Sequence, residues 1–161
     1  MVVKSLVEYP NPLLREVSTK VDVFNSDLRT LINDLIDTML AEDSMGLAAP
    51  QIGELKRVFV LNKKRIAGDR NKKYQPEDIL CIVNPEIKFQ GNPIDSSEGC
   101  LSFPGRRETI KRFNNIKLQA LNQENQYFML SGDGMLSILI QHEIDHLNGI
   151  LFIDRKYEIA G

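Results

Sequence analysis

Cysteine and histidine are scarce in this chain: two of each occur among 161 residues. Cys81 and Cys100 are too few for a disulfide framework and fit a reducing compartment, in which a thiolate is available for chemistry. No apolar run approaches the roughly 18 residues that a membrane helix needs, and residues 1–10 lack the features of a secretory or transit peptide. We therefore expect a cytoplasmic protein with no membrane partner.

Neither sign of charge dominates the sequence. Lys and Arg total 20 against 22 Asp and Glu, and this net charge of -2 gives no global attraction to nucleic acid or anionic lipid. Hydrophobic residues make up 42% and charged residues 26%, as in an average globular domain. The length suits one domain with its own core, so we expect a single domain over residues 1–161 and no specific nucleic-acid partner.

Local patterns predict two helices and several strands. From Asn25, where Ser26 or Asp27 can cap, apolar residues recur at the spacing of an amphipathic helix. Short apolar runs predict strands at Arg57–Leu61, Leu80–Asn84, Lys117–Leu121 and Tyr127–Leu130. The prolines of Tyr9–Pro12 predict a turn and no early helix, and Gly46–Gly53 is expected to form an ordered loop.

The second helix is expected from Met135 to Asn148, with Asp133 as its cap and Gly149 after its end. Its apolar residues spread around most of the circumference, which is typical of a helix enclosed by protein. Its polar residues therefore need a reason.

Those polar residues contain the pattern His-Glu-Ile-Asp-His. On a helix, His142 and His146 lie on one face with Cβ atoms about 5–6 Å apart, close enough for both to bind one metal ion. Glu143 stands where a carboxylate can act as general base toward a water at the metal. The alternative, two solvated histidines spaced four apart by chance, conflicts with the predicted burial, because unpaired buried imidazoles cost desolvation free energy.

A catalytic metal site needs a third protein ligand and an open position. No third histidine exists, and only Asp154 and Glu158 follow the motif as carboxylates, so we expect the third ligand upstream. Cys100 is the strongest candidate because Gly and Pro around it indicate a shaped loop or strand edge. Cys81 lies in an apolar run and is expected to be an inert core residue.

Three segments, in order, resemble the motifs of peptide deformylases: Gly46–Gly53, Glu98–Ser102 and Gln141–Gly149. The resemblance implies an α+β fold, with antiparallel β-sheets around a central buried helix carrying the HEIDH motif and an N-terminal amphipathic helix. It implies removal of the N-formyl group from the N-terminal methionine of newly synthesised proteins, with release of formate. The implied metal is Fe2+, which Zn2+, Ni2+ or Co2+ can replace.

The resemblance also implies roles for individual residues. Cys100, His142 and His146 would ligate the metal, and Glu143 would be the acid/base. Gln51 and the backbone N–H of Leu101 would bind the developing oxyanion. N-formylmethionyl peptides would form backbone hydrogen bonds with Gly46 and Gly99. Their methionine side chain would occupy a pocket, although plain core packing explains the pocket residues equally well; these are Met45, Leu101, Ile138 and Leu139.

Several neighbours of the motifs are open to two interpretations. Glu98 and Arg112 resemble the family's structural ion pair or are ordinary surface charges, and Arg107 lies beside the cleft or in solvent. Asp145 supports a ligand imidazole or faces water. Ser44 and Phe103 depart from the family pattern, and both are expected to flank the cleft.

The long basic C-terminal helix of many bacterial members is not found after Gly149, so we expect at most weak ribosome contact. The alternative basic patch is Lys63, Lys64, Arg65, Arg70, Lys72 and Lys73. Two other functions stay open: a metallopeptidase that cleaves internal peptide bonds, which would ordinarily show a third ligand downstream, and a deformylase-like binding protein without turnover.

Overall fold

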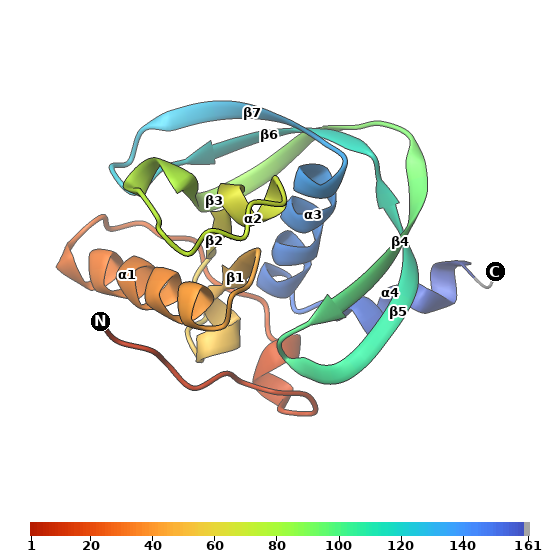
Figure 1. The fold of residues 1–161 in the computed structure, drawn as a ribbon, viewed down its shortest axis with the longest axis horizontal. Coiled ribbons are helices and arrows are strands. Elements are labelled where there is room, and N and C mark those ends of the chain that lie inside the picture. Colours follow the sequence, from red (N-terminus) through yellow and green to blue (C-terminus); the bar gives the residue numbers. More distant parts are fainter. Residues whose placement is uncertain (160–161) are drawn as a thin grey trace.

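The structure is a computed structural model that describes the backbone of residues 1–159 and the side chains of residues 1–155. It has an α+β fold with antiparallel sheets, as expected (Figure 1). The helix α3 (Met135–Leu147) lies between a five-stranded sheet and a two-stranded sheet.

The five-stranded sheet has the order β1-β2-β3-β6-β7, and all its strands pair antiparallel. Its strands are β1 (Gly46–Ala48), β2 (Val58–Asn62), β3 (Ile79–Gln90), β6 (Asn115–Leu121) and β7 (Tyr127–Asp133). The four strands predicted from apolar runs are confirmed. The expected loop at 46–53 is wrong, because Leu47 pairs with Val60 in β1 and a 3-10 turn, η2 (Ala49–Ile52), follows it.

The two-stranded sheet, β4 (Pro93–Cys100) and β5 (Phe103–Phe113), was not predicted as strands. Its residues are largely polar, but burial alternates along β4, so that Ser96 and Glu98 are buried between exposed neighbours. This period of two is the strand signal, carried here by polar side chains. The chain turns sharply at residues 101–102, and Cys100 pairs with Phe103.

Helix α1 (Ser26–Ala41) buries one apolar stripe, including Leu35 and Met39, beneath β1 and β2. Its cap is Asn25, whose side chain accepts a hydrogen bond from the N–H of Leu28, rather than Ser26 or Asp27.

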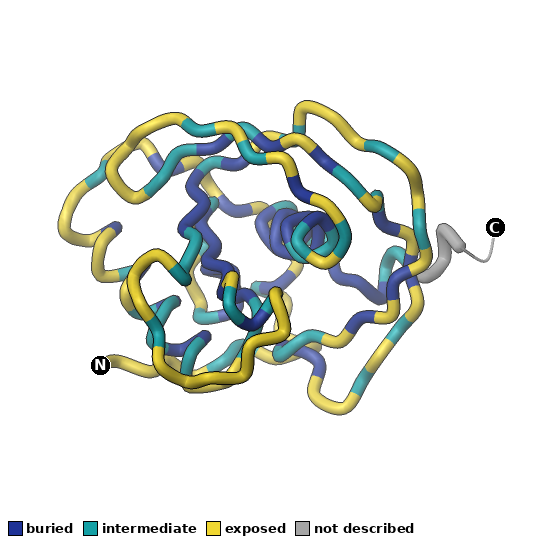
Figure 2. The backbone as a smooth tube through the Cα atoms, turned by 45° about the horizontal axis from the view of Figure 1, so that its top comes forward, coloured by how far each residue is buried: buried dark blue, intermediate teal, exposed yellow. Residues whose placement is uncertain are grey.

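Helix α3 starts directly after β7 and is buried over most of its length (Figure 2). The predicted cap, Asp133, is wrong because it belongs to β7, and Gly134 is the N-cap with φ 57°. At the other end Gly149 has φ 69°, and a Cβ there would lie 2.4 Å from the carbonyl oxygen of Arg15. Only glycine fits this close approach without strain.

The remaining helices are short: η1 (Pro12–Arg15), α2 (Lys63–Ile66), η3 (Pro76–Asp78) and α4 (Phe152–Ile159). Predicting no early helix was wrong, since Pro12 occupies the first position of η1, where its missing N–H costs no hydrogen bond. Within the described part of the chain, no helix is long and apolar enough to cross a membrane.

Candidate metal centre and substrate cavity

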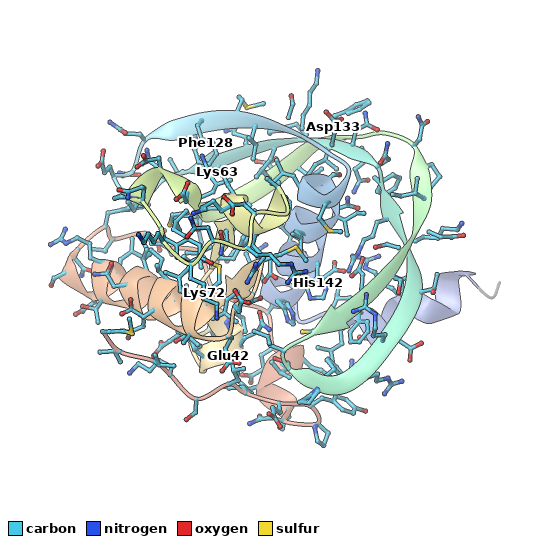
Figure 3. All side chains as sticks on the ribbon, in the orientation of Figure 1. Glu42, Lys63, Lys72, Phe128, Asp133 and His142 are labelled. Atoms are coloured by element: carbon cyan, nitrogen blue, oxygen red, sulfur yellow. The ribbon has the colours of Figure 1, made fainter. Side chains whose placement is uncertain are left out.

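The two histidines of α3 lie one turn apart and are both buried. Their ring centroids are 5.0 Å apart, and His142 lies near the centre of the molecule (Figure 3). The Nδ1 atom of His142 is 2.9 Å from Oε1 of Glu98. A carboxylate at this distance holds the proton on Nδ1, so the free nitrogen of the ring, Nε2, is available as a ligand.

Cys100 meets the histidine pair from the end of β4. Its Sγ lies 3.4 Å from Nε2 of His146, and one ligand atom from each of Cys100, His142 and His146 lies within 4.8 Å of the others. Bonds of about 2.0–2.3 Å from one ion to a thiolate and two imidazoles span such separations. The three residues therefore fit a single divalent ion. Asp154 instead pairs with Arg15, and the Glu158 side chain lies outside the described residues.

The charges at this site are strongly coupled. Burial opposes ionisation of Cys100, but the neighbouring His146 and His142 lower the pKa of its thiol well below the ordinary value. Burial also opposes the charge of His142, while hydrogen bonds to Cys100 and Glu98 raise its pKa to about 10. Thiolate and imidazole stabilise each other's ionised forms, and a metal cation takes the place of such protons.

A buried ion-pair network lies behind His142. Arg112 donates from Nε and Nη2 to the two carboxylate oxygens of Glu98, both at 2.9 Å, and from Nη1 to Asp145 at 2.6 Å. Burial disfavours the charge of Glu98, but His142 and Arg112 lower its pKa to about 2. Glu98 and Arg112 are thus a buried pair. For Asp145 neither expectation holds: it is buried, and it binds Arg112 rather than a ligand imidazole.

Glu143 and Gln51 lie beside the three candidate ligands. Burial raises the pKa of Glu143, and among the described residues its Oε2 has no hydrogen-bond partner. The side-chain oxygen of Gln51 accepts from the N–H of Ala48 at 3.0 Å. Its Nε2 is thereby directed to Cys100 Sγ at 3.5 Å and Ser102 Oγ at 3.3 Å. A buried carboxylate and an amide donor therefore lie at the same site.

A cavity of about 500 Å³ opens above these groups. All six predicted substrate-binding residues line it, together with Gln51, Cys100, His142 and Glu143. Arg107 also lines it and donates to the carbonyl of Ser97. A larger hollow of about 600 Å³ beside α1 contains none of the candidate catalytic residues, so its size has no bearing on the chemistry.

Ser44 and Phe103, which depart from the family pattern, lie in different places in the structure. Ser44 lines the cavity, and its hydroxyl donates to the carbonyl of Gly46 at 2.9 Å. The expectation for Phe103 is wrong: its ring stacks on Tyr9 and meets Phe152 edge-on in a buried cluster, and it does not line the cavity.

Sequence reasoning missed two features of the site. The carboxylate that supports His142 is Glu98, on another element, and Ser102 is the hydroxyl next to Gln51. Recognising the two-residue alternation of β4 would have placed Ser96, Glu98 and Cys100 on one face. Cys81 was predicted correctly: it is buried in the core, and burial raises its thiol pKa to about 12.

Comparisons with known proteins agree along nearly the whole chain. The family described as polypeptide deformylase matches residues 3–160. A peptide deformylase of Aquifex aeolicus is 40% identical over 154 residues, which cover 96% of this chain and 88% of that protein. One of Helicobacter hepaticus is 37% identical, covering 94% and 82%. The crystal structure of a Legionella pneumophila peptide deformylase superposes with a TM-score of 0.87 at 38% identity, covering 96% and 86%.

Proposed function

The chain belongs to the peptide deformylase family of hydrolases, which remove N-formyl groups from nascent peptides, and we propose how its own residues perform this reaction. Cys100, His142 and His146 hold the divalent metal ion. The observation that carries the proposal is the convergence of their ligand atoms within 4.8 Å at a cavity that Glu143 also lines. A metal bound there supplies Lewis acidity, which polarises the formyl oxygen and makes water a nucleophile near neutral pH.

Glu143 moves the proton in this proposal. It takes a proton from the attacking water, whose oxygen bonds to the formyl carbon, and delivers a proton to the nitrogen as the C–N bond breaks. The products are formate and a free amino terminus. The burial that raises its pKa supports the role, because a carboxyl group that both accepts and returns a proton works best with a pKa nearer neutrality.

Gln51 and the backbone N–H of Leu101 stabilise the negative charge that develops on the formyl oxygen. The hydrogen bond from Ala48 orients the Gln51 amide before substrate arrives, which supports the assignment. A donor fixed in this way contributes on the order of 3 kcal/mol to lowering the barrier.

The methionine side chain of the substrate occupies the apolar part of the cavity, formed by Met45, Leu101, Ile138 and Leu139. Gly46 and Gly99 offer backbone hydrogen bonds to the extended peptide. A Cβ at Gly46 would lie 2.9 Å from Leu61 and 3.2 Å from Oε1 of Glu143, so any larger residue would crowd the proton carrier.

Replacing Glu143 by Ala tests this mechanism. We expect formate release from formyl-Met-Ala-Ser to fall by about 10²–10⁴-fold, the usual contribution of a general acid–base, while metal stays bound. The matched control is Glu124→Gln in the exposed turn between β6 and β7, which should keep full activity. Undiminished turnover in E143A would contradict the mechanism. Cleavage of an acetylated or internal peptide by the unmodified protein would instead indicate a peptidase.

Residues 1–161 are proposed to form one catalytic domain, with α3 as its central buried helix. The burial of α3 residues 140–147 supports this. We propose Fe2+ as the native metal on the basis of the family resemblance; one thiolate and two imidazoles suit iron and also zinc, so Zn2+, Ni2+ or Co2+ could occupy the same ligands. Since Cys100 and iron are both oxidisable, the Fe2+ form should lose activity in air faster than the Ni2+ form, and equal half-lives would refute this.

Because its substrates are nascent peptides, we propose that the protein acts in the cytoplasm. The net charge of -2 gives no global attraction to ribosomal RNA, so we propose at most weak ribosome contact. The contact would use exposed cations such as Lys63 and Lys72, which lie on the segment between β2 and β3 (Figure 3). Arg65 drops out of the predicted patch because it is buried and paired with Asp43. Salt-sensitive ribosome binding that survives neutralising Lys63 and Lys72 would remove this proposal.

A further inference from the structure

The ion-pair network behind His142 extends outward to α4. Arg155 on this helix donates from Nε to Oδ2 of Asp145 at 2.5 Å and from Nη2 to Oδ1 at 2.7 Å. The Asp145 side chain is only 7% exposed, whereas that of Arg155 is 28% exposed. This two-point contact fixes the orientation of the carboxylate plane, which a single ammonium group cannot do.

The orientation of the Asp145 carboxylate in turn fixes the position of Arg112. Oδ2 of Asp145 also accepts from Arg112, whose other two donors hold Glu98. Glu98 in turn accepts from Nδ1 of His142. Positive and negative groups therefore alternate in one line from α4 to the proposed metal ligand, and each inner member has both neighbours within 2.9 Å.

We propose that Arg155 is a positioning residue for His142, through which α4 sets the metal affinity of the site; this inference rests on the proposed function. Without Arg155, Arg112 is the one remaining cation paired with the buried Asp145 carboxylate among the side chains of residues 1–155. Attraction between buried charges is strong. Arg112 would therefore move toward Asp145, and its two hydrogen bonds to Glu98 would weaken. The imidazole that Glu98 orients would then lose part of its alignment.

Contacts other than those of Arg155 also hold α4 against the rest of the protein. The effect of replacing Arg155 can therefore be separated from the effect of detaching the helix. Leu151, Phe152 and Ile153 are all buried in a cluster with Leu14 and Phe103. A second cation, Arg15, pairs with Asp154 on the same helix at 2.9 Å, with both side chains partly exposed. Arg15→Met therefore removes an ion pair to α4 without touching the line to His142.

The test is Co2+ binding to metal-free protein, followed by its visible absorption spectrum and by competition with a chelator. We expect R155M to weaken Co2+ binding by about three- to tenfold, below the 10–100-fold typical of groups that contact a ligand directly, and to alter the spectrum. R155K should recover part of the loss because it restores the charge. R15M should bind Co2+ with unchanged affinity and spectrum.

A double-mutant cycle isolates the route through Asp145. In the D145N protein, R155M should weaken Co2+ binding by less than it does alone, because the charge that Arg155 balances is gone. An R155M protein with lower thermal stability but unchanged Co2+ affinity and spectrum would overturn the proposal. If R155M does not fold, the comparison of R155K with R15M decides it: unchanged affinity in R155K refutes it. Co2+ binding needs no turnover, so failure of the E143A prediction leaves this test standing.

Discussion

The five-stranded sheet and the two-stranded β4–β5 sheet hold the same helix by different means. The larger sheet presents an apolar surface to α3: Phe59 and Leu118 of the sheet belong to the same buried cluster as Ile140 of the helix. The β4–β5 sheet presents Glu98 and Arg112, which meet the polar residues of α3. Apolar packing is non-directional, whereas buried ion pairs require fixed geometry. The first side therefore holds the helix in place, and the second orients the groups on it.

The two cysteines give the sharpest contrast between these regions. Cys81 on β3 is buried with a pKa of about 12, so at pH 7 its thiolate fraction is on the order of 10⁻⁵. Neighbouring histidines lower the pKa of Cys100, which is also less buried. In metal-free folded protein at pH 7, iodoacetamide should modify Cys100 orders of magnitude faster than Cys81.

Mass spectrometry of the alkylated protein measures this difference, and adding Co2+ should protect Cys100. Unfolding in urea serves as the control, because both thiols should then react at similar rates. Equal labelling of the two cysteines in the folded protein would contradict the predicted difference in their reactivity.

Arg112 and Lys111 are neighbours on β5 that point to opposite faces. Arg112→Met leaves Glu98 and Asp145 buried with weakened compensation and should lower the free energy of unfolding by about 3–5 kcal/mol. Lys111→Met breaks only the exposed pair with Asp95 and should cost within about 1 kcal/mol. Urea denaturation compares the two variants. If both variants lost similar free energies of unfolding, the buried ion pairs on the inner face of this sheet would contribute no more to stability than the exposed pair.

Leu118 on β6 tests the apolar side. It is fully buried, so Leu118→Ala should cost about 2–5 kcal/mol through lost transfer free energy and a cavity. Because it belongs to the packing surface, the Co2+ affinity of the folded L118A protein should stay at the level of the unchanged protein. Thermal unfolding and Co2+ titration measure the two quantities. A parallel loss of affinity would show that the two sides of α3 are not separable.

Much of this contrast could be predicted from local sequence. The helices at 26–41 and 135–147, four strands of the larger sheet (β2, β3, β6 and β7) and the inert Cys81 follow from the periodicity and length of apolar runs, whereas β1 was expected to be a loop. The spacing of His142, Glu143 and His146 follows from the helix itself. By contrast, the pattern of β4 escaped notice because its alternation is carried by serine, glutamate and cysteine rather than by apolar side chains.

The sequence by itself determined which residues could form helices, apolar strands and a pair of imidazoles on one helix face, because these depend on neighbours a few positions apart. Only the tertiary structure decided that Glu98, rather than Asp145, supports His142, and that Phe103 packs against Phe152 and does not line the cavity. A charged side chain is stable in the interior only where its partner meets it. Whether the two partners come together depends on the β4–β5 register and on how this sheet packs against α3. Both bring together residues that are far apart in the chain.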